Sequence, residues 1–219
     1  MDKARLLSGS TLFCDLNEQE LEELAAHAQW RSLPARKHVV LQGSQSQEMY
    51  AVLRGRLKVI RESEDGREAI LSILEPGEVF GELAMLDGAP RTATVETLEP
   101  CELLVLHRAD VIGFLENHPK VMHQLILMLC QRLRNADELV QDTLFLPLPQ
   151  RLGKALKSLA TEHGSDGKID LKFTQQEIGN LVGASRESVN KQLNAWQELG
   201  WLSMEDGRIQ LLAEDKLPG

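Results

Sequence analysis

Short apolar runs recur at an even spacing through the first half of the chain. Glycines occupy positions 43, 55, 66, 77 and 88, eleven or twelve residues apart. Alternating or β-branched runs lie between and after them, at 49–53, 57–60, 69–74, 92–95 and 103–106. Short strands separated by turn residues at this spacing are typical of an antiparallel sandwich or barrel. The pattern predicts an all-β domain, and it would look the same in a jelly roll that binds no ligand.

A helical period replaces the alternating one in the middle of the chain. One apolar stripe advances by four and three residues over three heptads, through Met122, Ile126, Leu129, Leu133, Ala136, Val140 and Thr143. This is the spacing of a coiled-coil seam. A second set, Val121, Leu125 and Met128, can cover the β-domain at the same time. Two stripes favour two partners and hence a homodimer; an amphipathic helix buried within one subunit is the alternative.

The segment 145–149 contains Pro147 and Pro149. Neither proline fits a helix interior, so the long helix is expected to end here. The segment is a candidate hinge between domains.

Residues 174–194 have the pattern of two helices joined by a tight turn. Thr174 and Glu177 have the spacing of a capping box, and Ser185 is suited to cap the second helix. Gly183 can supply the left-handed backbone that a short turn needs. The buried face of the second helix is expected to carry Val189, Leu193 and Trp196. An αα-hairpin that only packs inside a domain is the alternative to a DNA-binding motif.

Charged side chains gather on the outward face of that second helix, near its N-terminus. A helix-turn-helix protein presents this part of the helix to base edges in the major groove. Arginine can donate two hydrogen bonds to guanine and glutamate can accept one from cytosine. Groups at helix starts suit phosphate contacts. The predicted DNA-contacting residues are Thr174, Gln176, Ser185, Arg186, Glu187, Ser188 and Lys191.

The last twenty residues favour a winged version of the motif. Gly200 is expected to end the second helix. Runs at 201–204 and 208–212 flank Asp206-Gly207, a typical hairpin turn. Residues 168–172 are a candidate further strand. An ordinary surface hairpin has the same pattern.

A candidate anion site lies in the β-rich half, in the motifs FGELA at 80–84 and APRTA at 89–93. Gly81 lets the backbone come close to an anion, and amides of a short helix starting there can donate to phosphate. Glu82 can accept a ribose hydroxyl proton, and Arg91 can bind the phosphate with two hydrogen bonds. A surface Glu–Arg salt bridge beside a loop is the alternative.

The net charge of −9 at first argues against a nucleic-acid partner. However, residues 1–150 carry fifteen Lys or Arg and twenty-three Asp or Glu, whereas residues 151–219 carry nine and ten. The acidic excess therefore lies mostly in the part that need not approach DNA. Nonspecific DNA binding is expected to be weak and sensitive to salt.

Other classes of protein have little support in the sequence. Cys14, Cys101 and Cys130 and the six histidines are dispersed without metal-ligand spacing, so no metal, iron–sulfur or haem site is expected. No apolar run approaches the length of a membrane span, and the N-terminus lacks the apolar core of a signal peptide. A cytoplasmic protein is expected. No nucleophile is paired with a base at a persuasive spacing, so the protein is not expected to be an enzyme.

The chain resembles the CRP/FNR family of bacterial transcription regulators over nearly its whole length. The resemblance rests on two motifs in the order and at the distance found in that family: FGEL…PRTA at 80–93 and the helix-turn-helix pattern that begins at Thr174. The resemblance implies an α+β chain with three parts: a cyclic-nucleotide-binding β-roll with N-terminal helices at 1–108, a long dimerisation helix at 109–144, and a hinge and winged helix-turn-helix domain at 145–219. It implies Arg186, Glu187 and Lys191 as base readers. It also implies a homodimer on a pseudo-palindromic operator, with RNA polymerase as a further partner. The ligand residues expected from it are Gly81, Glu82, Leu83, Ala84, Arg91, Thr92, Ala136 and Asp137.

The effector itself is less clearly indicated. In cyclic-AMP-binding relatives a Thr followed by Ser or Asn on the long helix commonly meets adenine, and here these places hold Ala136 and Asp137. Adenine would face a carboxylate, whereas guanine offers two donors, N1–H and the 2-amino group, that one carboxylate can accept. Thr92 after Arg91 matches the Arg-Thr-Ala pattern of cyclic-GMP-binding kinase domains, although some cyclic-AMP regulators share it. Cyclic GMP is favoured, with cyclic AMP as the alternative.

Two further alternatives stay open from the sequence. Asp137 is equally compatible with a solvated helix position, and the chain with a constitutive regulator whose ligand pocket is degenerate. If the pocket does bind, ligand and DNA must strengthen each other's binding reciprocally.

Overall fold

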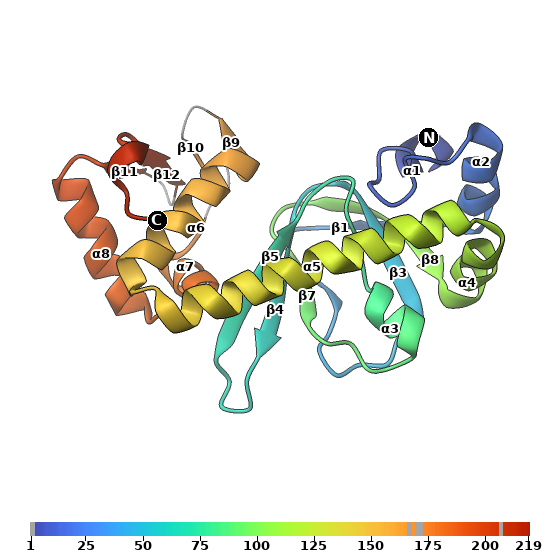
Figure 1. Cartoon of the computed structure of the whole chain (residues 1–219), viewed down its shortest axis with the longest axis horizontal. Helices are drawn as coiled ribbons and strands as arrows, with labels where there is room; N and C mark the ends of the chain where they lie inside the picture. Colours follow the sequence, from blue (N-terminus) through green and yellow to red (C-terminus); the bar gives the residue numbers. More distant parts are fainter. Residues whose placement is uncertain (1–2, 166–167, 170–172, 206–207) are drawn as a thin grey trace. The chain divides into compact units, whose positions relative to one another are not determined.

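The computed structural model describes residues 3–165, 168–169, 173–205 and 208–219 (Figure 1). The chain forms two compact units, residues 1–134 and residues 135–219. Each unit has its own hydrophobic core, and each is described separately.

Two four-stranded antiparallel sheets form the centre of the first unit. One sheet has the order β1-β8-β3-β6, with β1 Gln29–Leu33, β8 Cys101–His107, β3 Glu48–Arg54 and β6 Val79–Phe80. The other has the order β2-β7-β4-β5, with β2 His38–Val40, β7 Thr94–Thr97, β4 Leu57–Glu62 and β5 Glu68–Leu74. The predicted antiparallel β-roll is confirmed.

The evenly spaced glycines lie at the turns between these elements. All five have positive φ, between 73° and 97°, a region that L-residues with a side chain rarely adopt. At Gly55 an added Cβ would also lie 2.4 Å from the Pro100 carbonyl oxygen. The regular spacing of these glycines in the sequence therefore reflects a regular spacing of turns with left-handed backbone.

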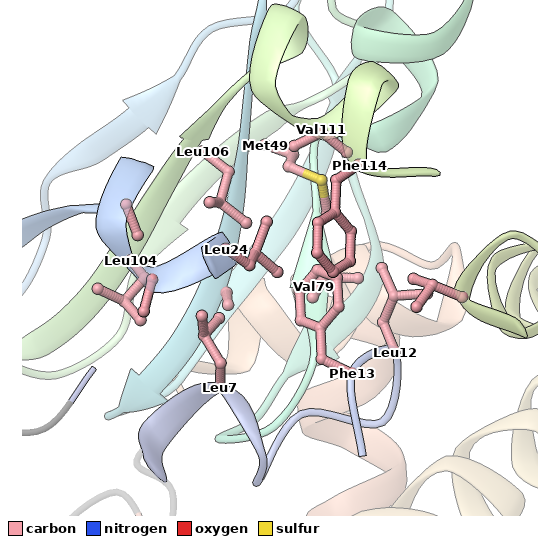
Figure 2. Packing of buried hydrophobic residues seen from close by; sticks show 14 of the residues in the cluster. Leu7, Leu12, Phe13, Leu24, Met49, Val79, Leu104, Leu106, Val111 and Phe114 are labelled. Carbon is pink, nitrogen blue, oxygen red and sulfur yellow. The ribbon is translucent and has the colours of Figure 1, made fainter. Parts of the chain in front are cut away.

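Helices cover one face of the roll and complete its core. They are α1 Lys3–Leu7, α2 Glu18–His27, α3 Glu82–Asp87 and α4 Arg108–Asn117. Phe13, Val79 and Phe114 belong to one buried cluster (Figure 2), which the first part of α5 joins through Val121 and Leu125.

The segment 109–144, expected as one helix, is two helices. The prediction was wrong on this point: α4 ends at Asn117 and α5 runs from Pro119 to Phe145. Proline lacks the amide that would continue the ladder, and it disfavours helical backbone in the residue before it. His118 accordingly has φ −126° and ψ 74°.

The two predicted stripes of the long helix behave differently. Val121 and Leu125 are buried, and Met128 packs against the same core. Most seam positions face solvent, with Met122, Ile126, Leu133 and Val140 exposed to 41%, 51%, 64% and 58%, whereas Leu129 is partly buried against the core of the roll.

The second unit is a winged helix-turn-helix. After the end of α5 it contains α6 Leu148–His163, α7 Gln175–Val182 and α8 Arg186–Glu198. Its sheet has the order β11-β12-β10-β9, with β11 Leu202–Glu205, β12 Arg208–Leu211, β10 Lys168–Ile169 and β9 Gly164–Ser165, and a 3₁₀ turn spans Glu214–Lys216. The predicted Asp206-Gly207 turn and residues 170–172 lie outside the described residues.

The Pro147–Pro149 segment ends α5 as predicted, but only Pro147 lies between helices. Pro149 is the second residue of α6. A proline is tolerated there, because the first turn of a helix has no carbonyl to receive its missing amide hydrogen.

Gly153 marks the closest approach within the second unit. A Cβ at this position would lie 1.8 Å from the Pro218 carbonyl oxygen. We expect Gly153→Ala to lower the free energy of unfolding by about 1–3 kcal/mol, the usual cost of forcing atoms into a packed site.

Urea unfolding of the purified protein measures this effect. Gly113→Ala is the control, because that helical glycine has nothing within 4 Å of an added Cβ. We expect the control to be neutral or slightly stabilising. Equal stability of both variants would contradict the close packing at Gly153.

Candidate functional site

The first candidate site is built around the start of α3. Gly81 precedes the helix with φ 85° and ψ 6°. A Cβ there would lie 2.4 Å from the Arg91 Nη1 atom and 3.0 Å from the Glu48 carbonyl oxygen. Only glycine fits this place, for reasons of both backbone conformation and space.

Arg91 lies against this turn, with 4% of its surface exposed. Its guanidinium donates to the Gly81 carbonyl at 2.7 Å, to Ser46 Oγ at 2.8 Å and to the Glu48 carbonyl. Its Nε has no hydrogen-bond partner within the described part of the chain. Burial lowers the pKa of Arg91, and the charges of neighbouring acids only partly oppose that effect. The guanidinium is thus a buried cation bonded to neutral oxygens.

The ring of Tyr50 lies next to the Arg91 guanidinium. Its ring stacks on Phe80 with centroids 4.8 Å apart, and the Arg91 guanidinium carbon lies 5.8 Å from its centroid. The Tyr50 hydroxyl donates to Glu48 Oε2 at 2.5 Å. Burial, and then the bond to Glu48, raise the pKa of Tyr50 to about 12. The phenol is therefore neutral at ordinary pH and orients its neighbours by hydrogen bonding.

Glu82 is buried as well, but it does not form the surface pair with Arg91 considered as the alternative. Its carboxylate, 2% exposed as a residue, pairs with Arg132 Nη1 at 2.6 Å. Arg132 also donates to the Val79 carbonyl. The sequence interpretation missed Arg132. The available signal was its position four residues after Met128, which extends the stripe that packs on the roll.

The other predicted ligand residues differ in their surroundings. Ala84 is buried, while Leu83 and Thr92 are exposed. The expected strand at 92–95 begins only at Thr94, which leaves Arg91 and Thr92 in the loop before β7. Ala136 and Asp137 are exposed residues of α5 that belong to the second unit. The structure thus groups Gly81, Glu82, Ala84 and Arg91.

The second candidate site is the pair α7–α8. Thr174 Oγ accepts from the Glu177 amide at 3.1 Å, and Glu177 Oε2 accepts from the Thr174 amide at 2.9 Å, which completes the predicted capping box. Gly183 has φ 65°, and Ser185 Oγ accepts from the Ser188 amide at 3.2 Å. Val189, Leu193 and Trp196 are buried as expected.

The outward face of α8 carries the predicted base readers. Arg186, Glu187, Ser188 and Lys191 are all exposed. The hydroxyls of Thr174 and Ser185 already act as caps, and Gln176 donates to Asn180 at 2.8 Å. These three predicted phosphate-contacting side chains thus have partners within the motif itself.

One cross-helix contact was missed from the sequence. Gln175 Nε2 donates to Asn190 Oδ1 at 3.0 Å, which ties the start of α7 to the middle of α8. Pairing of two amide side chains fifteen residues apart has no periodic signal in the sequence.

Some features are absent from the described residues. They contain no helix long and apolar enough to cross a membrane. Residues 3–165, 168–169, 173–205 and 208–219 also contain no cluster of three His, Cys, Asp or Glu side chains that could hold a metal ion.

Comparison with known proteins agrees with this geometry. Residues 30–118 match the model of the cyclic nucleotide-binding domain, and residues 150–218 match the Crp-like helix-turn-helix domain. The chain is 30% identical to a CRP-like cAMP-activated global transcriptional regulator of Mycobacterium tuberculosis, over 97% of this chain and 96% of that one. It is 32% identical to a cyclic AMP receptor protein of Thermus thermophilus, over 94% of each.

A solved structure shows the same architecture. The crystal structure of a CRP/FNR-family transcriptional regulator from Thermus thermophilus matches with a TM-score of 0.74 and 27% identity, over 86% of this chain and 96% of that one.

A cyclic-nucleotide-binding domain followed by a helix-turn-helix domain defines a nucleotide-binding transcription regulator. The chain belongs to the CRP/FNR family of such regulators, whose members are not enzymes. The family, the fold class and the non-enzymatic class predicted from the sequence are confirmed.

We call the group formed by Gly81, Glu82, Ala84 and Arg91 the cradle. The ion pair between Glu82 and Arg132 is expected to stabilise it. Arg132→Met leaves a buried carboxylate without its cation, and we expect it to lower the free energy of unfolding by about 1–3 kcal/mol. The double variant Glu82→Gln/Arg132→Met should recover part of that loss, because the unpaired buried carboxylate is then gone. Denaturant unfolding of the three proteins measures the coupling.

Arg134→Met is the matched control. Arg134 lies two residues further along α5 and donates to Gln131 on the same helix at 2.9 Å. Its loss should change stability by less than about 0.5 kcal/mol. A single Arg132→Met variant as stable as the double variant would show that Glu82 does not depend on this pair.

Proposed function

We propose that this regulator is a homodimer whose binding to a pseudo-palindromic operator is controlled by a cyclic nucleotide, with cyclic GMP favoured. The buried Arg91 guanidinium beside Gly81 carries the proposal. It is a cation whose nearest hydrogen-bonding partners are neutral oxygens, so an anionic acceptor would bind it more strongly.

The cradle has the groups that a cyclic phosphate and its ribose require. The exocyclic oxygens would receive the Arg91 donors and the amides at the start of α3, with Leu83, Ala84 and Thr92 at its edge. The Glu82 carboxylate, held in place by Arg132, would accept the ribose hydroxyl. Binding then exchanges the Gly81 and Glu48 carbonyls for a charged ligand at Arg91.

The exposed seam supports dimerisation. Met122, Ile126, Leu133 and Val140 are exposed apolar residues along one face of α5, and a large exposed apolar patch is typical of an interaction site. A second copy of the same helix buries them by heptad packing. Two α8 helices related by a two-fold axis then reach half-sites about one helical turn, roughly 34 Å, apart.

The choice of effector rests on Asp137. We propose that the purine meets Asp137 of the long helix. A carboxylate accepts both donors of guanine and repels the N1 lone pair of adenine.

Cyclic AMP is the second candidate, because the similar regulators of Mycobacterium tuberculosis and Thermus thermophilus are named for it. A constitutive regulator is the third. Calorimetry with both nucleotides separates the three, since a degenerate pocket would bind neither.

We expect cyclic GMP to bind roughly ten- to a hundredfold more tightly than cyclic AMP, the effect of one unsatisfied polar edge. Asp137→Thr should narrow this preference, and Asp137→Asn should do so with almost no change of size. Tighter binding of cyclic AMP to the unaltered protein, or an unchanged preference in both variants, would reject the assignment.

Arg186 is expected to read a G·C pair. Arg186→Ala should remove discrimination worth about 1–3 kcal/mol at that position, measured by selecting DNA from a random pool with cyclic nucleotide present. Arg186→Lys keeps the charge but loses the planar fork, so it should retain affinity better than preference. An unchanged selected sequence in both variants would contradict this role.

Ligand and DNA are proposed to act on one equilibrium between two arrangements of the dimer. A ligand beside the seam favours one arrangement, and DNA selects the same one, so each tightens binding of the other. We also propose RNA polymerase as a partner and the cytoplasm as the location, because transcription of bacterial DNA takes place there.

A further inference from the structure

The joint between α5 and α6 is held by charged side chains that the proposed ligand and DNA sites do not use. Lys154 Nζ of α6 lies 2.5 Å from Glu138 Oε1 and 2.6 Å from Asp142 Oδ2, both on α5. The two bonds raise the pKa of Lys154, and Asp142 contributes most. All three residues belong to the second unit.

The connection between α5 and α6 is short, and hydrogen bonds to backbone carbonyls of α5 stabilise it. Only Leu146 and Pro147 separate the helices, and the Leu146 amide donates to the Asp142 carbonyl at 3.0 Å. Arg151 donates to the Thr143 carbonyl at 3.2 Å, one of the last α5 carbonyls, which have no helical partner. We call residues 138–154 the elbow. In it, α6 is joined to α5 by the side chains of Arg151 and Lys154 as well as by the backbone.

The acidic pair lies on the face of α5 opposite the seam. Glu138 and Asp142 are two residues before and after Val140, which places each about 160° around the helix from it. The same turns thus present apolar residues to a second subunit and carboxylates to α6.

We propose that Lys154 is a positioning residue for operator binding: its two ion pairs fix α6, and with it the helix-turn-helix, to the seam-bearing end of α5. The proposal deepens the proposed function, in which the seam responds to ligand. It differs from a free hinge at 145–149, because a hinge would need no ionic connection across it.

The first test needs neither ligand nor DNA. Amide hydrogen exchange in the elbow should be roughly three- to tenfold faster in Lys154→Gln than in the unaltered protein, the size expected for partly exposed ion pairs. High salt should bring the unaltered protein towards the variant. Unchanged exchange in Lys154→Gln would overturn the ionic connection.

The second test measures affinity for a duplex selected by the unaltered protein with saturating cyclic nucleotide. Lys154→Gln should bind about three- to tenfold more weakly. Lys157→Gln is the control: it removes the same charge from the same helix, but Lys157 donates to the Gly219 backbone oxygen at 3.0 Å rather than to α5. Equal losses in both variants would reduce the effect to nonspecific charge and overturn the positioning role.

Charge exchange separates positioning from stability. Lys154→Glu alone brings three carboxylates together and should weaken DNA binding further. The triple variant Glu138→Lys/Asp142→Lys/Lys154→Glu restores attraction and places only good helix formers at the three positions, so it should recover affinity. Failure to recover, with a thermal unfolding temperature like that of the unaltered protein, would count against the proposal. If cyclic nucleotide leaves DNA affinity of the unaltered protein unchanged, the proposed function fails, while the exchange test still decides the elbow.

Discussion

The cost of burying a cation explains how the residues around the start of α3 are arranged. Arg91 is taken out of water and bonded to two backbone carbonyls and a serine hydroxyl, which accept three hydrogen bonds from its Nη atoms without neutralising its charge. Gly81 must lack a side chain for the guanidinium to fit, and Tyr50 must lie beneath it. A cation held in this way supports the proposal that an anionic ligand binds there.

Three directions around α5 are used for three purposes. Val121, Leu125 and then Arg132 face the roll, most of the seam residues face solvent, and Glu138 with Asp142 faces α6. A helix with about 3.6 residues per turn can keep such stripes separate over its length. One helix can therefore carry the residues that contact the roll, the proposed dimer seam and the residues that contact α6 with little overlap between the three sets.

The second unit follows its local signals more closely than the first. Its capping box, its Ser185 cap and its left-handed Gly183 appear in the structure as the spacing of the residues predicts. These interactions join residues at most four apart, so their geometry is set by the chain itself. The Gln175–Asn190 contact is different, because it exists only once the two helices cross.

The sequence by itself determined the antiparallel roll, the helix-turn-helix and the glycine, acid and arginine of the cradle motif, because periodicity, turn residues and caps act over a few residues. Only the tertiary structure decided that Glu82 pairs with Arg132, that Arg91 turns onto backbone carbonyls, and that Lys154 joins α6 to α5. In each case the two partners are separated by at least ten residues of sequence. Many other residues of the same charge could have formed the same contact. Burial and distance choose among them, and neither exists before the chain has folded.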